Sequence, residues 1–158
     1  MPHTRMLGVS FRSDKTPKFH TSPKSRKVRD ITLNNRASLT FAFQQKMRSV
    51  SLEGFLEPLS DEELTADWGK LDTEFRKNYL VFGHQSGARI NSLQDLRSQQ
   101  NQLSISSEEY RPLSFIGYSF KGIKRIAFYA VGEKDFALCE VFEFDKNNQS
   151  WTHELRAP

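Results

Sequence analysis

Residues 37–43 read Ala-Ser-Leu-Thr-Phe-Ala-Phe, and this stretch decides the fold class. Leu39, Phe41 and Phe43 alternate with small or polar residues, which is the period of two expected of a β-strand with one apolar face. A second extended stretch, residues 48–56, follows after a short connection. The two stretches together predict a pair of adjacent strands.

The rest of the chain repeats this pattern, with short helices inserted. Further strands are predicted at residues 5–11, 19–21, 115–120, 124–131, 136–144 and 151–155. Helices are predicted at residues 26–33 with Ser25 as the capping residue, from Ser60 through Trp68, briefly within 72–84, and at 92–103. Because strands come in hairpin-like pairs and do not alternate strictly with helices, we expect a mainly β fold. It would be an antiparallel sheet or barrel with peripheral helices.

The composition excludes several classes of protein. The 158 residues fit one ordinary domain, 1–158, and a single cysteine rules out an intrachain disulfide. Cys139 lies in an apolar strand pattern, so we expect a buried structural thiol. The four histidines show no ligand spacing, which argues against a metal site. No apolar run is long enough to cross a membrane or to form a secretory signal, and we expect a cytoplasmic protein.

Charge is unevenly distributed along the chain. Residues 1–50 hold eleven Lys or Arg against Asp14 and Asp30, a net charge of +9, whereas residues 51–158 hold twelve against seventeen acids, a net of −5. A basic segment indicates an anionic partner or simply a solvated basic face. The basic residues stand among short apolar runs, which favours a folded phosphate site over a nucleic-acid-binding arm.

The segment Thr21–Lys27 is the most informative local feature. A strand is predicted to end and a helix to begin there, with hydroxyl groups and the adjacent cations Arg26 and Lys27 at the junction. Free backbone amides and the helix dipole favour an anion at such a helix start. The alternative is a helix cap that happens to lie beside two surface cations.

Seven short motifs occur in a fixed order along nearly the whole chain. They are Arg5-Met6-Leu7, Phe19-His20-Thr21, Ser25-Arg26-Lys27, the stretch from Asn34 to Phe41, Arg48-Ser49-Val50, Gln85-Ser86, and the ending from Trp151 to Pro158. In this order they resemble the motifs of the pyridoxamine 5'-phosphate oxidase family, whose fold is an FMN-binding split β-barrel. The family segment that precedes the first strand has no counterpart here, so the chain is read as a fragment, a short isoform or a shortened paralogue.

The resemblance implies a twofold homodimer with FMN in a cleft at the subunit interface. It implies that FMN is contacted by Arg5, Thr21, Arg26, Lys27, Ser49, Gln85, Ser86 and Tyr129. Arg26 and Lys27 would hold the FMN phosphate, and Ser49 and Tyr129 stand where the family has Gln and Trp. The implied reaction is the FMN-dependent oxidation of a phosphorylated small molecule, pyridoxamine or pyridoxine 5'-phosphate, to pyridoxal 5'-phosphate.

The residues that grip the substrate in the family are changed. Ser10 replaces its phosphate-binding Lys, and Asp67, Leu71 and Phe75 replace its Tyr, Arg and Ser. The family's Arg-Leu-His-Asp-Arg run is replaced within residues 135–141, so no catalytic residue is assigned. We therefore expect weak turnover of B6 vitamers, and a non-catalytic paralogue that keeps the FMN site and the dimer is the alternative.

Overall fold

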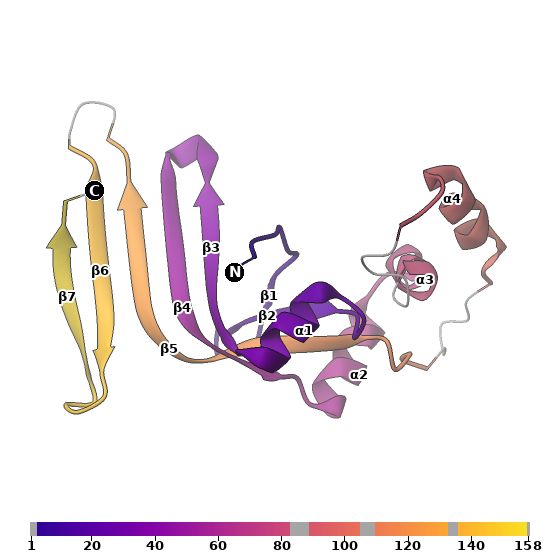
Figure 1. Cartoon of the computed structure of the whole chain (residues 1–158), viewed down its shortest axis with the longest axis horizontal. Coiled ribbons are helices and arrows are strands. Elements are labelled where there is room, and N and C mark those ends of the chain that lie inside the picture. Colours follow the sequence, from indigo (N-terminus) through magenta and orange to yellow (C-terminus); the bar gives the residue numbers. More distant parts are fainter. Residues whose placement is uncertain (1–2, 83–88, 105–109, 133–135, 158) are drawn as a thin grey trace. The chain divides into compact units, whose positions relative to one another are not determined.

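The computed structural model describes residues 3–82, 89–104, 110–132 and 136–157, which form seven strands and four α-helices (Figure 1). In chain order the elements are β1 (Ser10–Phe11), β2 (Pro17–Thr21), α1 (Arg26–Leu33), β3 (Arg36–Phe43), β4 (Arg48–Pro58), α2 (Asp61–Lys70), α3 (Thr73–Phe82), α4 (Leu93–Gln102), β5 (Ile116–Ala130), β6 (Leu138–Asp145) and β7 (Ser150–Arg156). The strand order is β1-β2-β5-β4-β3, with β6 paired to β5 and β7 to β6. The fold is mainly β with peripheral helices, as the sequence predicted.

The chain divides into two compact units, which share the long strands β4 and β5. The first unit comprises Met1–Asn34 and Glu57–Ser119, and the second comprises Asn35–Leu56 and Phe120–Pro158. The first four residues of β5 pair with β2, and its later residues pair with β6. Each unit is described separately below.

The first unit has an aromatic core beneath helix α2. Leu59, Leu64, Trp68 and Phe115 form a buried cluster, and Phe115 has no exposed surface. The Tyr79 ring from α3 meets Phe115 edge-on, with 5.0 Å between ring centroids. Helix α2 begins with the predicted capping box, in which the Glu63 amide donates to the Ser60 hydroxyl and the Ser60 amide donates to the Glu63 carboxylate.

The second unit is a sheet of strands β3, β4, β5, β6 and β7 lying side by side (Figure 1). In the part of the chain that the structure describes, this unit contains no α-helix, only a short 3-10 turn at Gln44–Lys46. Among its described residues, a small cluster of buried side chains consists of Ala127, Cys139 and Val141. Cys139 is a buried free thiol, as its strand pattern predicted. Several large apolar side chains of this unit stay exposed: Phe43, Met47, Tyr129, Val131, Phe136, Leu138, Trp151 and Leu155.

The largest differences between the observed and the predicted strand and helix boundaries occur in three places. The two strands expected at 115–120 and 124–131 are one continuous strand, β5, because Gly122 adopts a left-handed φ of +57° and takes up the irregularity without ending the strand. The strand expected at 5–11 is reduced to Ser10–Phe11, the residues that pair with β2. The brief helix expected within 72–84 is the ten-residue helix α3.

The alternation that first indicated strands is confirmed in β3. Leu39 and Phe41 are half-buried, whereas Ser38, Thr40 and Ala42 on the other face are exposed. Strand β3 pairs with β4 over its full length, from Arg36 opposite Phe55 to Phe43 opposite Arg48. No helix in the described ranges is long and apolar enough to span a membrane.

Candidate functional site

The junction between β2 and α1 brings together the hydroxyl and ammonium groups expected from the sequence. Strand β2 ends at Thr21, a turn closes with the Ser25 amide donating to the Ser22 carbonyl at 3.0 Å, and α1 begins at Arg26. Thr21, Ser22 and Ser25 are all buried. The Thr21 and Ser25 hydroxyl oxygens lie 3.1 Å apart, and Lys27 Nζ donates to Thr21 Oγ1 at 2.8 Å. We call Thr21, Ser25 and Lys27 the junction site.

The expectation that the Ser25 side chain caps helix α1 was wrong. Ser25 occupies the N-cap position with extended backbone, but its hydroxyl makes no capping hydrogen bond, because it faces Thr21 instead. The first amides of a helix have no partner within the helix. Those of Arg26 and Lys27 are therefore not capped by Ser25, which fits a helix start that receives an anion.

Lys27 is the cation placed in the junction site. Burial lowers the pKa of its ammonium group, and the nearby positive charge of Arg5 lowers it further. An anion bound beside Lys27 would offset both effects, because it would restore the interactions that the charged amine loses on leaving water. The two positive charges of Arg5 and Lys27 are therefore close enough to affect one another.

Tyr79 is a residue that the sequence analysis missed. Its hydroxyl donates to the Thr21 backbone carbonyl, and burial raises the pKa of the phenol above its ordinary value of 10.0. Its ring packs on Phe115 and Trp68 in the core of the first unit. Tyr79 therefore ties the end of β2 to that core. Its spacing of four residues from Phe75 within a helical pattern was the only available signal.

Arg26 takes a direction different from that of Lys27. Its guanidinium donates to His3 Nε2, so the His3 proton lies on Nδ1, which donates to Asp30 at 3.2 Å. Arg5 Nη2 lies 4.0 Å from the same Asp30 carboxylate. Arg26 is exposed and stands beside the junction site, with its guanidinium bound to His3 instead of to the Thr21 and Ser25 hydroxyls.

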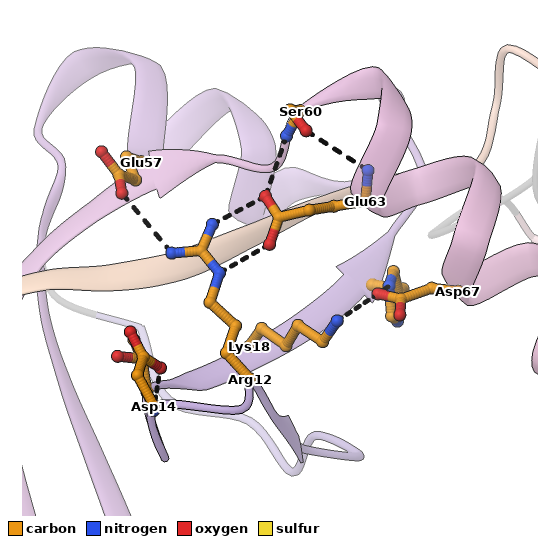
Figure 2. Close-up of polar contacts among 9 residues, drawn as sticks. Arg12, Asp14, Lys18, Glu57, Ser60, Glu63 and Asp67 are labelled. Atoms are coloured by element: carbon orange, nitrogen blue, oxygen red, sulfur yellow. Dashed lines mark hydrogen bonds and ion pairs between the residues drawn. The ribbon is translucent and has the colours of Figure 1, made fainter.

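A second polar cluster consists of Lys18 and His20 from β2 with Asp67 from α2. Figure 2 shows Lys18 pointing toward Asp67. Lys18 Nζ donates to Asp67 Oδ2 at 2.5 Å, and His20 Nε2 lies 3.0 Å from the same oxygen. Lys18 and Asp67 are each 8% exposed. Burial alone would raise the pKa of Asp67, but the hydrogen bond and charge of Lys18, with help from His20, outweigh it and lower the pKa.

Two contacts position the His20 side chain: its ring stacks on an aromatic residue, and its Nε2 lies beside Asp67. The ring stacks on Phe115, with centroids 4.6 Å apart. Burial lowers the pKa of His20 below 6.5, and the partial compensation by Asp67 does not reverse this. Gly117 lies opposite His20 in the sheet, where an added Cβ would approach the Phe19 carbonyl to 2.8 Å. The same Cβ would lie 2.6 Å from Leu59 Cδ1, so the close packing of Leu59 and the Phe19 carbonyl requires glycine at this position.

Arg12 forms a third contact with helix α2 (Figure 2). Its Nε and Nη2 donate to the two oxygens of Glu63 at 2.7 and 2.8 Å, and its Nη1 lies 3.6 Å from Glu57. The hydrogen bond from Arg12 is the main reason that the pKa of Glu63 is lowered. The cationic side chains of Arg12 and Lys18 are therefore both bound by carboxylates of the first unit.

The positions expected to grip substrate carry no available cation. Ser10 is exposed and pairs with Lys18 in the adjacent strand, but Lys18 is bound to Asp67. Leu71 packs against the aromatic core, and the Phe75 ring is 45% exposed. Asp67, the fourth of these positions, carries a carboxylate whose charge is matched by Lys18.

Two cations of helix α3, Arg76 and Lys77, have contacts within the first unit. Arg76, which is 8% exposed, donates to the Gly69 carbonyl at 2.9 Å and lies over the Trp68 ring. Lys77 lies 3.2 Å from the Glu74 carboxylate. Both cations are thus held by the helices of the first unit.

The remaining predicted site residues are not brought to the junction by any described contact. Ser49, in β4, is partly exposed and pairs with Ala42, and Tyr129, in β5, is 38% exposed and pairs with Cys139. Both belong to the second unit. Gln85 and Ser86 lie outside the described residues. No group of three or more His, Cys, Asp or Glu side chains within the described ranges could hold a metal ion.

Comparison with solved structures identifies the class of fold. The chain superposes on a pyridoxamine 5'-phosphate oxidase-related, FMN-binding protein from Nostoc punctiforme PCC 73102 with a TM-score of 0.77 and 18% identity, covering 98% of this chain and 80% of the other. The fold is therefore the split β-barrel of pyridoxamine 5'-phosphate oxidase-like proteins, as the sequence resemblance indicated. No family model matches the chain.

Two further similarities concern proteins of phenazine metabolism. PhzG from Burkholderia lata 383, solved with tetrahydrophenazine-1-carboxylic acid, gives a TM-score of 0.82 at 19% identity, over 98% of this chain and 74% of that one. Dihydrophenazinedicarboxylate synthase of Pseudomonas chlororaphis is 22% identical over 158 residues, which are 99% of this chain and 69% of that protein. These values mark a diverged chain with a shared fold.

Proposed function

We propose that the protein is an FMN-binding oxidoreductase of the pyridoxamine 5'-phosphate oxidase-like kind, and that the junction site receives the FMN phosphate. The observation that carries this proposal is the placement of Thr21, Ser25 and the desolvated Lys27 at a helix start that the Ser25 side chain does not cap. Such a set suits a phosphate dianion, because hydroxyls, amides and an ammonium group all donate to it. Arg26 would leave His3 and join Lys27 on the phosphate.

The other FMN contacts follow from the resemblance alone. Arg5 would add charge beside Lys27, and Ser49, Gln85, Ser86 and Tyr129 would lie near the flavin ring. When bound, FMN would supply the acceptor for a hydride from the substrate, with oxygen as the final oxidant. Tyr79 would act as a positioning residue, because it fixes the Thr21 backbone against the core.

The substrate class is proposed from the side chains at the expected phosphate grip. Ser10, Leu71 and Phe75 carry no charge, and Asp67 is paired with Lys18. These contacts favour an unphosphorylated, reduced ring compound, such as the ligand class of the PhzG complex. Pyridoxine or pyridoxamine 5'-phosphate is the second candidate and follows from the family resemblance. A cytoplasmic location remains part of the proposal.

A homodimer is proposed because the second unit exposes apolar side chains. In the described residues, the second unit buries few apolar side chains and exposes Phe43, Trp151 and Leu155 on strands that no helix of that unit covers. Apolar surface of this extent commonly marks an interface. Faces such as Leu39 with Phe41, or Val50 with Leu52, would be buried by the second copy. A stable monomer at micromolar concentration in a mass measurement would contradict the dimer.

The FMN proposal is tested by removing the two junction cations. Arg26→Ala with Lys27→Ala should weaken FMN binding by about 2–4 kcal/mol, or roughly 30- to 1000-fold, because charge-assisted hydrogen bonds to the phosphate are lost. Lys24→Ala is the matched control, since Lys24 is exposed in the same turn. FMN titration by flavin fluorescence gives the affinities, and circular dichroism reports the fold. Equal FMN affinities of the double variant and the control would show that the FMN phosphate does not bind at the junction site.

The substrate proposal is tested by turnover with saturating FMN. Tetrahydrophenazine-1-carboxylic acid and pyridoxine 5'-phosphate are supplied separately, with oxygen uptake as the common readout. Oxidation of the carboxylic acid at about 1 s⁻¹ or faster, the low end of typical enzymes, would support the first candidate. Comparable turnover of pyridoxine 5'-phosphate would support the second. Tight FMN binding without turnover of either compound would leave the non-catalytic paralogue.

A further inference from the structure

The segment that precedes β1 contacts helix α1 and holds one of the two cations assigned to the FMN phosphate. Residues 3–9 belong to neither a helix nor a strand. The His3 side chain is 29% exposed and contacts α1 through both of its ring nitrogens. Side-chain contacts therefore attach this segment to the helix, and its backbone is not part of a strand ladder.

His3 bridges two side chains that lie one helical turn apart. Arg26 and Asp30 occupy positions i and i+4 of α1, so they are neighbours on one face of the helix. The Asp30 carboxylate accepts from His3 Nδ1 at 3.2 Å, which leaves Nε2 as the acceptor for the Arg26 guanidinium. Asp30 thus fixes the imidazole in the tautomer that can accept from Arg26.

The adjacent cations Arg26 and Lys27 are held by different groups. Lys27 Nζ donates to Thr21 Oγ1 at 2.8 Å in the junction site, whereas the Arg26 guanidinium donates to His3. Neighbouring residues of a helix are about 100° apart around its axis, so their side chains leave it in different directions. In the structure, one cation is therefore in the junction site and the other is bound by the segment before β1.

We infer that His3 competes with the FMN phosphate for the Arg26 guanidinium, so that residues 3–9 lower the affinity of the junction site for FMN. The inference rests on the proposed function and concerns the regulation of that same site. A guanidinium makes stronger hydrogen bonds to a phosphate dianion than to a neutral imidazole, so FMN can displace His3. The apparent affinity for FMN is lowered in proportion to the fraction of molecules in which Arg26 is bound to His3.

The remaining contacts of the segment allow this exchange without its detachment from the helix. Asp30 Oδ2 lies 3.2 Å from His3 Nδ1 and 4.0 Å from Arg5 Nη2. When Arg26 turns to the phosphate, His3 keeps its hydrogen bond to Asp30, and Arg5 stays beside the same carboxylate. Only the contact between Arg26 and His3 has to break.

The experiment is a double-mutant cycle on FMN affinity, measured by flavin fluorescence titration of the full-length protein. His3→Ala should tighten FMN binding about three- to tenfold, because Arg26 no longer has to leave an acceptor. The same substitution in an Arg26→Ala background should change the affinity less than about twofold. Thr4→Ala, at an exposed neighbouring position, is the control and should bind FMN as the parent does. An equal tightening in both backgrounds would overturn the inference, because His3 would then act without Arg26.

Riboflavin, which lacks the phosphate, separates competition for Arg26 from a general opening of the site. His3→Ala should leave the riboflavin affinity within about twofold of the parent, because riboflavin has no group that takes Arg26 from His3. Equal gains for FMN and riboflavin would refute the competition. FMN binding that His3→Ala does not change would remove this inference and leave the proposed function intact. A lack of FMN binding in the parent and in every variant would remove both.

Discussion

The two units of this protein are stabilised in different ways. In the first unit, helix α2 packs on an aromatic cluster around Phe115, and buried charges are paired, as in Lys18 with Asp67. In the second unit, only Ala127, Cys139 and Val141 cluster in the interior of the described residues, and the charged pairs, such as Arg125 with Glu53, are largely on the surface. A sheet gains stability by burying one or both faces. Among the described residues, the first unit therefore has an aromatic core, whereas the cluster of buried side chains in the second unit is small.

The largest expected effect comes from removing the centre of the first core. Phe115→Ala should lower the free energy of unfolding by about 3–5 kcal/mol, because it leaves a cavity beneath Trp68, Tyr79 and His20. Urea unfolding measures the loss. Leu113→Ala, at a side chain that is 89% exposed, should stay within about 0.5 kcal/mol of the parent. Similar losses in both variants would mean that Phe115 is not the centre of this core.

The next effect comes from breaking the buried ion pair. Lys18→Met should cost about 3 kcal/mol, because it leaves the Asp67 carboxylate in a site where the side chain is only 10% exposed. Adding Asp67→Leu should restore most of the loss, since the buried charge is then gone as well. Chemical denaturation of the single and double variants decides the point. A double variant as unstable as the single one would show that packing, not charge, controls this position.

A smaller effect is expected at the exposed face of the second unit. Phe43→Asp should weaken the proposed dimer at least tenfold, or about 1.4 kcal/mol, because Phe43 is 49% exposed on the same face as Leu39 and Phe41. Sedimentation velocity over a concentration series gives the dissociation constant. Thr40→Asp, on the opposite face of β3, is the control. A stronger effect of the control would place the interface on the other face of the sheet.

The smallest effect is a pH dependence caused by His20. Its pKa in the folded protein lies below the ordinary 6.5 because the imidazole is buried, so the unfolded chain takes up the proton first as the pH falls. The contribution of His20 to stability is therefore complete above pH 6.5 and declines below it. Protonation of the neighbouring Asp67 changes the free energy of unfolding only near pH 3.8 and below, because the pKa of Asp67 in the folded protein is lowered from that value.

His20→Gln should make the stability curve flatter between pH 6.5 and 5 than that of the parent protein. The measurement is the urea midpoint across this range. His153→Gln, at a side chain that is 49% exposed, is the comparison variant for the loss of a surface histidine. An identical slope in His20→Gln and the parent would contradict the assignment of the titration to His20.

Local sequence patterns predicted most elements correctly. Helix α1 has the predicted bounds, and the capping box at Ser60 and Glu63 starts α2 as expected. The alternation in β3 gave both the strand and its faces. These features depend on residues within one or two turns of each other, so the sequence alone contains the information. The prediction was wrong where a distant strand decided the outcome, as at residues 5–9, which have no strand partner among the described residues.

Only some of the predicted site residues contact one another in the structure. Thr21 and Lys27 are joined by a hydrogen bond, but Ser25 faces Thr21 instead of capping the helix, and Arg26 binds His3. A rotamer choice among several nearby partners cannot be derived from spacing along the chain. The assignment of these residues to FMN stays a prediction, as do the roles of Ser49 and Tyr129 in the second unit.

The sequence by itself determined the mainly β fold, the resemblance to pyridoxamine 5'-phosphate oxidase-like proteins, and the position of the basic helix start. Only the tertiary structure showed that Lys18 and Asp67, 49 residues apart, form a buried pair, and that Tyr79 reaches the Thr21 carbonyl 58 residues away. The physical reason is the separation along the chain over which each effect acts. Propensity and periodicity act between neighbours in sequence, whereas the burial that makes a charge costly and a hydrogen bond necessary exists only after distant segments have packed together.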